Sequence, residues 1–301
     1  MKVLITGASG LVGGRLSYFL LKKGIKVTSV SRKKKKFKKI NWNSEKSLNN
    51  LCKDQDIVIN CAGVDVNNSK NLKKTKKINS ELPFRVFKAA NKSKVKLFIF
   101  LSTYHVYDFK KKNIINEKSK LSLKNNYTIS KIEGEKKLLN YKRKYTKIAI
   151  IRSCNLFGYP IYKNTSCWNL IINSMIKNLS LNKKFLIKSK SNEYRYYSSI
   201  MNFCYFIYFL LKTYKKVLKK NDQIILNYTS NINLRLTDLT KKICLTLKKP
   251  ESLIKYKYKR LKEGKKIIFQ SFFHKRIFRI QDIFFLNEVK LVALKLKKKV
   301  L

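Results

Sequence analysis

Histidine and paired cysteine, the usual ligands of metal sites, are scarce in this sequence. Its 301 residues include two histidines and six cysteines, and no two cysteines have the CxxC spacing. Structural zinc needs several such ligands close together, so we predict no metal site. Dispersed cysteines in hydrophobic stretches are typical of reduced core residues and favour a cytoplasmic protein. The six are Cys52, Cys61, Cys154, Cys167, Cys204 and Cys244.

Acidic residues are also rare. The chain has 16 Asp and Glu against 70 Lys and Arg, which gives a net charge of +54. Such a charge attracts nucleic acids and anionic membranes without specificity. Only ten of the basic residues are arginine, and the lysines are spread through every segment beside many Asn and Ile, as an AT-rich genome produces. Because readers of nucleic acids use arginine forks with interleaved aromatics, and no such array occurs here, we predict no specific nucleic-acid partner.

Hydrophobic runs are too short to cross a bilayer. The longest, Ile200–Leu211, falls short of the ~20 residues that a transmembrane helix needs. The N-terminus is already a core strand, so no signal peptide is expected, and we predict no membrane span. The aromatic and basic stretch Phe269–Leu301 can form an amphipathic helix, which either packs on its own domain or touches a membrane surface.

Glycine is scarce overall but concentrated at the N-terminus. Five of the nine glycines fall in the first 24 residues. The aliphatic run Lys2–Thr6 predicts a buried strand, and the helical pattern after it ends near Gly24. Between them, Gly7, Gly10 and Gly13 have the GxxGxxG spacing. A strand, glycine turn and helix in this order hold the diphosphate of a dinucleotide at the helix N-terminus, so we predict a nucleotide site here.

The end of the second predicted strand bears on which dinucleotide is bound. Ile25–Val30 reads as that strand, and Ser31, Arg32 and Lys33 follow it. An acidic residue at this position accepts hydrogen bonds from the 2′-hydroxyl of the adenosine ribose, whereas Arg accommodates a 2′-phosphate. Because no acidic residue is present and all three side chains can bond phosphate, NADP is favoured over NAD.

Strands and helices alternate through the first half of the chain, which predicts an α/β fold with a doubly wound parallel sheet of the Rossmann type. The pattern is less regular after Pro160, so we expect a Rossmann domain at 1–158 and a smaller, interleaved substrate-binding lobe at 159–301. The further predicted strands are Lys39–Trp42, Asp56–Asn60, Lys96–Leu101, Lys147–Ile151, Lys184–Ile187 and Gln223–Tyr228; the further helices are Ser47–Cys52, Ser80–Ala90, Tyr127–Leu138, Trp168–Ile176, Ile200–Leu211 and Leu239–Leu247.

Three residues in the middle of the chain form a candidate catalytic set. Tyr127 and Lys131 are four apart on a predicted helix and therefore share one face. An ammonium group at Lys131 would lower the pKa of the Tyr127 phenol and can reach the nicotinamide ribose. A hydroxyl on Thr103, at the end of a neighbouring strand, would hold the substrate oxygen. This combination indicates a proton donor and acceptor beside a hydride carrier.

Together these segments resemble the extended short-chain dehydrogenase/reductase family, in particular the NAD(P)-dependent epimerase/dehydratase enzymes that act on nucleotide sugars. The matching segments are TGASGLVGGRL at Thr6–Leu16, NCAG at Asn60–Gly63, LSTYHVYD at Leu101–Asp108, YTISKIEGE at Tyr127–Glu135, RSCNLFG at Arg152–Gly158, EYRYYSSI at Glu193–Ile200 and, more loosely, Gln223–Ile243.

The resemblance implies roles for individual residues. Contacts to the cofactor are implied for Gly7, Gly10, Leu11, Val12, Gly13, Ser31, Arg32, Cys61, Ala62, Gly63, Tyr127 and Lys131. Contacts to the substrate are implied for Ser102, Asn155 and Arg195, with Asn155 and Arg195 facing its diphosphate. The resemblance also implies a homodimer packed through the helix that carries Tyr127.

Two departures from the family pattern bear on the chemistry. Dehydratases of the family carry Asp-Glu directly after the catalytic Thr, whereas this chain has Tyr104 and His105. The missing carboxylates count against 4,6-dehydration. His105 is either a base, since histidine titrates near working pH, or a hydrogen-bonded wall residue. The family usually has acidic residues after the Arg segment, where Met201 and Asn202 stand here, so the lid geometry is left open.

Two functions follow from these features. The first is an NAD(P)-dependent nucleotide-sugar epimerase or 4-keto reductase that uses Thr103, Tyr127 and Lys131. The alternative is a non-catalytic NAD(P)-binding regulatory or scaffold protein of the same fold. Retention of three reacting groups at these intervals favours the enzyme.

Overall fold

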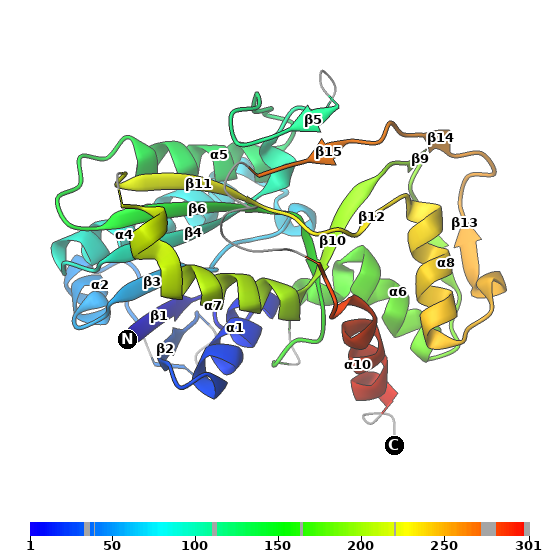
Figure 1. Ribbon diagram of the computed structural model, residues 1–301, viewed down its shortest axis with the longest axis horizontal. Helices are drawn as coiled ribbons and strands as arrows, with labels where there is room; N and C mark the ends of the chain where they lie inside the picture. The colour runs from blue at the N-terminus through cyan, green and yellow to red at the C-terminus, as the bar shows by residue number, and fades with distance from the viewer. Residues whose placement is uncertain are drawn as a thin grey trace.

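The computed structural model describes residues 1–32, 37–38, 40–109, 113–162, 165–219, 221–271 and 281–297. Six parallel strands form its central sheet in the order β11-β6-β4-β3-β1-β2 (Figure 1). This order confirms the predicted doubly wound parallel sheet. The strands are β1 (Lys2–Thr6), β2 (Lys26–Val30), β3 (Ile57–Asn60), β4 (Leu97–Thr103), β6 (Lys147–Ser153) and β11 (Gln223–Tyr228).

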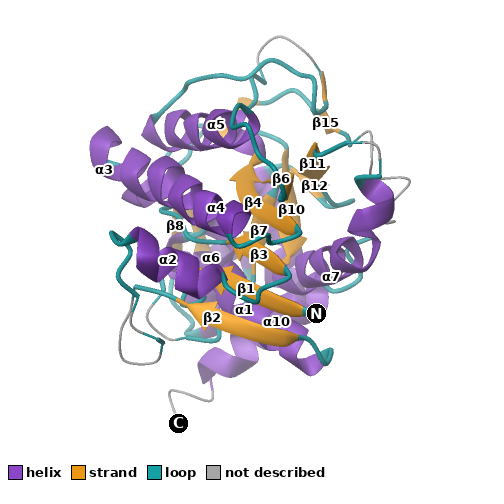
Figure 2. Cartoon of the chain, turned by 90° about the vertical axis from the view of Figure 1, so that its left-hand side faces the viewer, coloured by secondary structure: helices purple, strands orange, loops and turns teal. Residues whose placement is uncertain are grey.

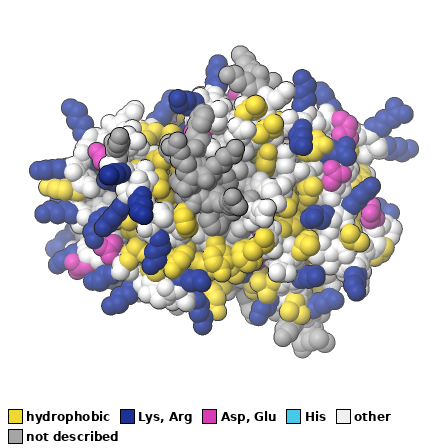
Figure 3. Space-filling view, in the orientation of Figure 1, with side chains coloured by type: hydrophobic (Ala, Val, Ile, Leu, Met, Phe, Trp, Pro, Cys, Tyr) yellow, Lys and Arg dark blue, Asp and Glu magenta, His cyan; other side chains and the backbone are white. Residues whose placement is uncertain are grey.

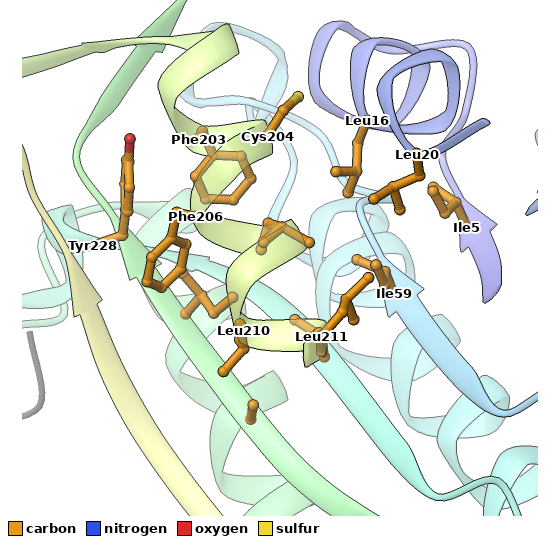
Figure 4. Packing of buried hydrophobic residues seen from close by; sticks show 14 of the residues in the cluster. Ile5, Leu16, Leu20, Ile59, Phe203, Cys204, Phe206, Leu210, Leu211 and Tyr228 are labelled. Atoms are coloured by element: carbon orange, nitrogen blue, oxygen red, sulfur yellow. The ribbon is translucent and has the colours of Figure 1, made fainter. Parts of the chain in front are cut away.

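Helices cover both faces of the sheet (Figure 2). One buried cluster joins one face to α1 and α7, and a second joins the other face to α2, α4 and α5. Figure 4 shows the first cluster, where Leu16 and Leu20 of α1 meet Phe203 and Leu211 of α7 over Ile5 and Ile59. The helices around the large sheet, taking both faces together, are α1 (Leu11–Lys22), α2 (Glu45–Cys52), α3 (Leu72–Lys76), α4 (Leu82–Lys92), α5 (Asn126–Leu139) and α7 (Ile200–Val217).

One predicted strand is wrong. Residues 37–38 and 40–42 form no strand, and Lys39 lies outside the described residues. The side chains of Ile40 and Trp42 instead pack beside the cluster that includes α2 and α4. Two apolar residues in a lysine-rich segment produce a strand-like pattern, although they are partly buried against this cluster without pairing as a strand.

The second lobe has its own core and shares elements with the first. Its helices α6 (Ile171–Ser180), α8 (Leu236–Leu247) and α10 (Phe285–Lys297) surround one cluster. Its small sheet has the order β12-β10-β7, and parallel pairs β8–β13, β9–β14 and β5–β15 extend along it. Their bounds are β5 (Ile114–Ile115), β7 (Asn155–Phe157), β8 (Phe185–Ile187), β9 (Ser191–Asn192), β10 (Arg195–Ser199), β12 (Asn233–Leu234), β13 (Ile254–Tyr256), β14 (Lys262–Glu263) and β15 (Ile268–Phe269).

The chain crosses between the lobes more than once. β7 follows β6 directly but belongs to the small sheet, while α7 and β11 return to the large one. The lobes are therefore interleaved, and the division at residue 158 remains a proposal for where the first one ends. Across this junction, Arg15 of α1 forms a buried ion pair with Glu288 of α10 at 3.0 Å, and the same carboxylate accepts the backbone N–H of Tyr159.

The C-terminal helix packs on its own protein. In α10, Phe285, Val289 and Val292 are buried in the core of the second lobe. Of the stretch Phe269–Leu301, the structure describes residues 269–271 and 281–297. For these residues it favours packing on the protein's own domain over a membrane contact. No described helix combines the length and apolarity that a bilayer crossing requires.

On the face shown in Figure 3, the described lysine and arginine side chains are scattered around the molecule, with uncharged side chains between them. This agrees with the interpretation of the lysines as a general bias in composition. All six cysteines are free, and no cluster of metal-ligating side chains occurs within the described ranges.

We predict that Glu288→Gln lowers the free energy of unfolding by about 3–5 kcal/mol, because it leaves the Arg15 charge buried without an anionic partner. Urea denaturation measures the change. Glu45→Gln is the control, because the Glu45–Lys92 pair is largely exposed and its loss leaves stability unchanged within error. Equal effects of the two substitutions would contradict the prediction.

Candidate active site

The turn between β1 and α1 is a backbone cradle that has no room for side chains. Gly7 has a φ of 71°, and a Cβ there would lie 2.6 Å from the backbone nitrogen of Ala62. A Cβ on Gly13 would lie 2.5 Å from the Gly7 carbonyl oxygen. Gly10 caps the helix, and no side chain bonds the N–H groups that open it. The cradle fits a diphosphate, because these N–H groups and the helix dipole attract anions.

A cavity of about 540 Å³ opens at this cradle, beyond the carboxyl ends of β1, β2 and β3. Ligands bind in this position in open α/β sheets. Seven of the residues assigned to the cofactor from the sequence line it: Gly7, Gly10, Ser31, Arg32, Cys61, Ala62 and Gly63. Leu11 and Val12 form the first turn of α1, and Gly13 packs on Gly7.

The sequence analysis did not predict that the other residues lining the cavity belong to this site. Thr165 and Ser166 come from the second lobe, and the Ser166 hydroxyl donates to Asp65 Oδ2 at 2.8 Å. Trp42 lines the same cavity, although its segment was predicted to be a strand. Only the folded chain brings these segments together. The remaining lining residues are Ser9, Val64, Asp65, Asn68, Ile78 and Leu82.

The end of β2 places two polar side chains at the cavity. The hydroxyls of Ser31 and Ser9 lie 2.6 Å apart and share a hydrogen bond. Arg32 also lines the cavity, while Lys33 lies outside the described residues. This end of the cavity can hold an anionic group on a ribose.

The three candidate catalytic residues lie together. Thr103 is the last residue of β4, and its hydroxyl lies close enough to the Tyr127 phenol to lower its pKa, against burial. α5 begins at Asn126, where Asn125 and Thr128 form a capping box, so Tyr127 occupies its first turn and Lys131 the next. Lys131 Nζ donates to the Leu101 carbonyl at 2.8 Å. A Cβ on Gly63 would be 3.3 Å from that Nζ, so Lys131 reaches the wall of the cavity.

Burial dominates the protonation of this set. It raises the pKa of Tyr127 to about 12 and lowers the pKa of Lys131 to about 8. In the structure as it stands, Lys131 does not offset the rise in the Tyr127 pKa that burial causes. The Lys131 ammonium is directed to the Leu101 carbonyl, and the charge of Asp65 pushes the Tyr127 pKa further up.

His105 has the geometry of a wall residue. Asn155 Nδ2 donates to Tyr104 Oη at 2.8 Å and to the Tyr196 carbonyl at 3.0 Å, so its Oδ1 is the acceptor for His105 Nε2 at 3.2 Å. The Nε2 atom of His105 therefore carries a proton and cannot accept another. Burial also lowers the pKa of His105 to about 4, so the ring is neutral near pH 7. These observations favour the wall interpretation over the base.

The three residues assigned to the substrate have different surroundings. Ser102 is only 3% exposed and donates to Glu135 in the interior, a position that does not favour its assignment to the substrate. Alternate residues of a strand face opposite sides, and Thr103 takes the side of Tyr127. Asn155 is occupied by protein partners, whereas Arg195 is 41% exposed, pairs with Glu193 and lies close enough to His105 to act on its pKa.

Asn79 is a buried residue at this site that the sequence analysis missed. It lies in a π-helical turn, Lys77–Glu81, ahead of α4, and is fully buried. Its amide accepts the N–H of Val64 at 2.8 Å and donates to the hydroxyl of Ser130 at 3.1 Å. The π turn, which often marks functional sites, is invisible in a lysine- and asparagine-rich stretch.

Comparisons with known families and structures agree with this geometry. A family model described as the NAD dependent epimerase/dehydratase family matches residues 3–225. No curated protein matches the chain in sequence.

Solved structures of nucleotide-sugar enzymes share the whole fold at low identity. A UDP-N-acetylglucosamine 4-epimerase from Methanobrevibacter ruminantium, solved with UDP-N-acetylmuramic acid, is 17% identical with a TM-score of 0.83, over 100% of this chain and 99% of that one. A UDP-glucose 4-epimerase from Thermotoga maritima, solved with UDP-glucose, is 17% identical with a TM-score of 0.82, and MoeE5 with UDP-glucose and NAD is 14% identical with a TM-score of 0.82; both matches cover 100% of each chain. These likenesses establish the fold, including the C-terminal lobe.

Arg32→Ala is expected to weaken NADPH binding about tenfold and to leave NADH binding within about twofold, because only NADPH carries a 2′-phosphate on the adenosine ribose for this guanidinium to bond. Titration followed by nicotinamide fluorescence in moderate salt measures both affinities. Arg260→Ala, an exposed arginine away from the cavity, is the control for loss of charge. Selective binding of NADH by the unmodified protein would overturn the role assigned to Arg32.

Proposed function

The chain belongs to the NAD dependent epimerase/dehydratase family, and from that membership we propose that it is a nucleotide-sugar epimerase or 4-keto reductase with a preference for NADP. The observation that carries the proposal is the proximity of Thr103, at the end of β4, to Tyr127 in the first turn of α5, with Lys131 one helical turn further on at the wall of the cavity. We assign Tyr127 as the proton donor and Thr103 as a second hydroxyl at the inner end of this nucleotide site.

Some residues of the site bind the cofactor, and others orient the substrate or transfer a proton. A bound NAD(P) supplies hydride transfer at the nicotinamide. The cradle of Gly7, Gly10 and Gly13 holds the diphosphate, and Arg32 bonds the ribose phosphate. Thr103 orients the sugar oxygen by a hydrogen bond, and Tyr127 exchanges a proton with that oxygen.

The raised pKa of Tyr127 decides whether it is ready to donate or to accept a proton. With a pKa of about 12 the phenol holds its proton at neutral pH, so it is ready to donate to a ketone oxygen. To accept a proton from a sugar hydroxyl, it needs a nearby positive charge that stabilises the phenolate. Lys131 supplies that charge if its ammonium turns from the Leu101 carbonyl toward the phenol and the ribose hydroxyls.

Dehydration is not supported. The positions that hold an Asp-Glu pair in the dehydratases are Tyr104 and His105 in this chain. Tyr104 is 5% exposed and bonded to Asn155, and His105 is neutral and bonded to the same amide. Neither can take the part of a carboxylate, which leaves epimerisation and reduction.

We expect Tyr127→Phe to lower kcat by about 10²–10⁴-fold, because it removes the proton that Tyr127 exchanges with the sugar. Turnover of a panel of UDP- and dTDP-sugars with NADP(H) and NAD(H) measures the loss. Tyr145→Phe is the control, since Tyr145 is 45% exposed. Wild-type turnover in Tyr127→Phe would remove the mechanism.

The same panel tests the alternative function. A folded protein that binds NADP(H) but turns over none of these sugars is a regulatory or scaffold protein. The engagement of Asn155 with protein groups rather than with open space is the observation that favours it. A cytoplasmic location and a homodimer packed through α5 remain proposals, and sedimentation of the purified protein tests the dimer.

A further inference from the structure

A buried ion pair lies behind the candidate catalytic set. Glu135 of α5 and Arg152 of β6 are 2% and 3% exposed. Arg152 Nε bonds both Glu135 oxygens, at 3.2 and 3.1 Å, and Nη2 bonds Oε2 as well. Ser102 of β4, 3% exposed, donates its hydroxyl to Oε1. One carboxylate thus ties α5 to two neighbouring strands of the sheet.

The other arm of the guanidinium extends the network to the second lobe. Arg152 Nη1 donates to the Tyr107 hydroxyl at 2.9 Å, and that hydroxyl donates to Asn227 Oδ1 of β11 at 2.7 Å. The Asn227 amide in turn donates to the Gln270 carbonyl beside β15 at 2.8 Å. The network therefore joins α5, the strands β4, β6 and β11 of the large sheet, and the residue that follows β15.

Four members of this network, Ser102, Tyr107, Glu135 and Arg152, are close neighbours in the chain of residues proposed for the site. Ser102 precedes Thr103 on β4, Tyr107 follows His105 by two residues, and Arg152 precedes Asn155 by three. Glu135 stands one helical turn beyond Lys131 and two beyond Tyr127, on the same side of α5. Glu135 and Arg152 therefore lie on elements that carry or adjoin the candidate catalytic set, and Glu135 shares a helix face with Lys131 and Tyr127.

We propose that Glu135, paired with Arg152, is a positioning residue. It holds α5 against β4 and β6, so that Tyr127 remains next to Thr103. It also keeps Lys131 protonated. This inference rests on the proposed function of the same site. A purely structural pair would stabilise the fold without acting on the protonation of Lys131.

The surroundings of Lys131 show why its charge needs support. Cys61 at the end of β3 faces it with a thiol that burial keeps neutral, since its pKa is raised to about 12. The Phe100 ring and the Leu101 carbonyl face it from β4, at 5.0 Å and 2.8 Å. Glu135 is the carboxylate that raises the pKa of Lys131, against burial, which lowers it. Arg152, from β6, acts on the same carboxylate with opposite charge.

The first test compares Glu135→Gln with Glu133→Gln. Glu133 is on the same helix but pairs at the surface with Lys76 and Lys137, so it is the matched control. In Glu135→Gln the alkaline limb of the kcat profile should move down by about one pH unit or more, which is a tenfold loss at a pH on that limb. KM and cofactor affinity should stay within about threefold, and Glu133→Gln should match the unmodified protein throughout.

A second variant covers the case in which Glu135→Gln fails to fold because Arg152 is left unpaired. Glu135→Gln with Arg152→Met removes both buried charges, a change that proteins often tolerate without loss of stability. Lys131 still loses its carboxylate in this variant, so the same shift of the pH profile is expected.

A readout without turnover separates this inference from the proposed function. The pH dependence of acetylation at Lys131 by acetic anhydride, quantified by mass spectrometry, gives its pKa in each variant. Loss of Glu135 should move the midpoint to lower pH by about one unit or more. An unchanged midpoint in both Glu135 variants would overturn the inference, whether or not a sugar substrate is found. A midpoint that moves in a protein without sugar turnover would support the inference and contradict only the catalytic proposal.

Discussion

The close approach of backbone to backbone at the ends of β1 and β3 is the constraint on which the site depends. Gly7, Gly13 and Ala62 lie so near one another that a Cβ at either glycine would overlap main-chain atoms. This contact places the open N-terminus of α1 over the carboxyl edge of the sheet, where the cavity forms. The helix dipole then faces the position of the diphosphate, and Cys61–Gly63 extends the wall toward Lys131.

Burial governs the chemistry of the groups around that cavity. It holds the Tyr127 phenol protonated, weakens the hold of Lys131 on its proton, and keeps His105 neutral. The polar groups that oppose burial come from behind the site. Glu135 and Arg152 compensate each other, so a charged network can lie within the sheet layer while one of its members acts on Lys131.

Predictions from local pattern were accurate where one segment carries the whole signal. All six central strands and the helix of Tyr127 and Lys131 were predicted close to their observed bounds, because buried strands and amphipathic helices have a clear period. Errors arose where burial depends on distant partners. Trp42 lines the cavity although its segment forms no strand, and the Ser102 hydroxyl bonds Glu135 instead of facing the substrate side. Asn79 reaches the site only because a π turn packs its segment against α5.

The sequence by itself determined the glycine turn, the parallel sheet and the spacing of Thr103, Tyr127 and Lys131, because each rests on residues that are near in the chain or on one period. The tertiary structure alone decided which polar groups meet. Contacts such as Arg15 with Glu288, Ser166 with Asp65, and Glu135 with Arg152 join residues from separate elements. Their partners, and the pKa shifts that follow, depend on which surfaces the packed helices and strands remove from water.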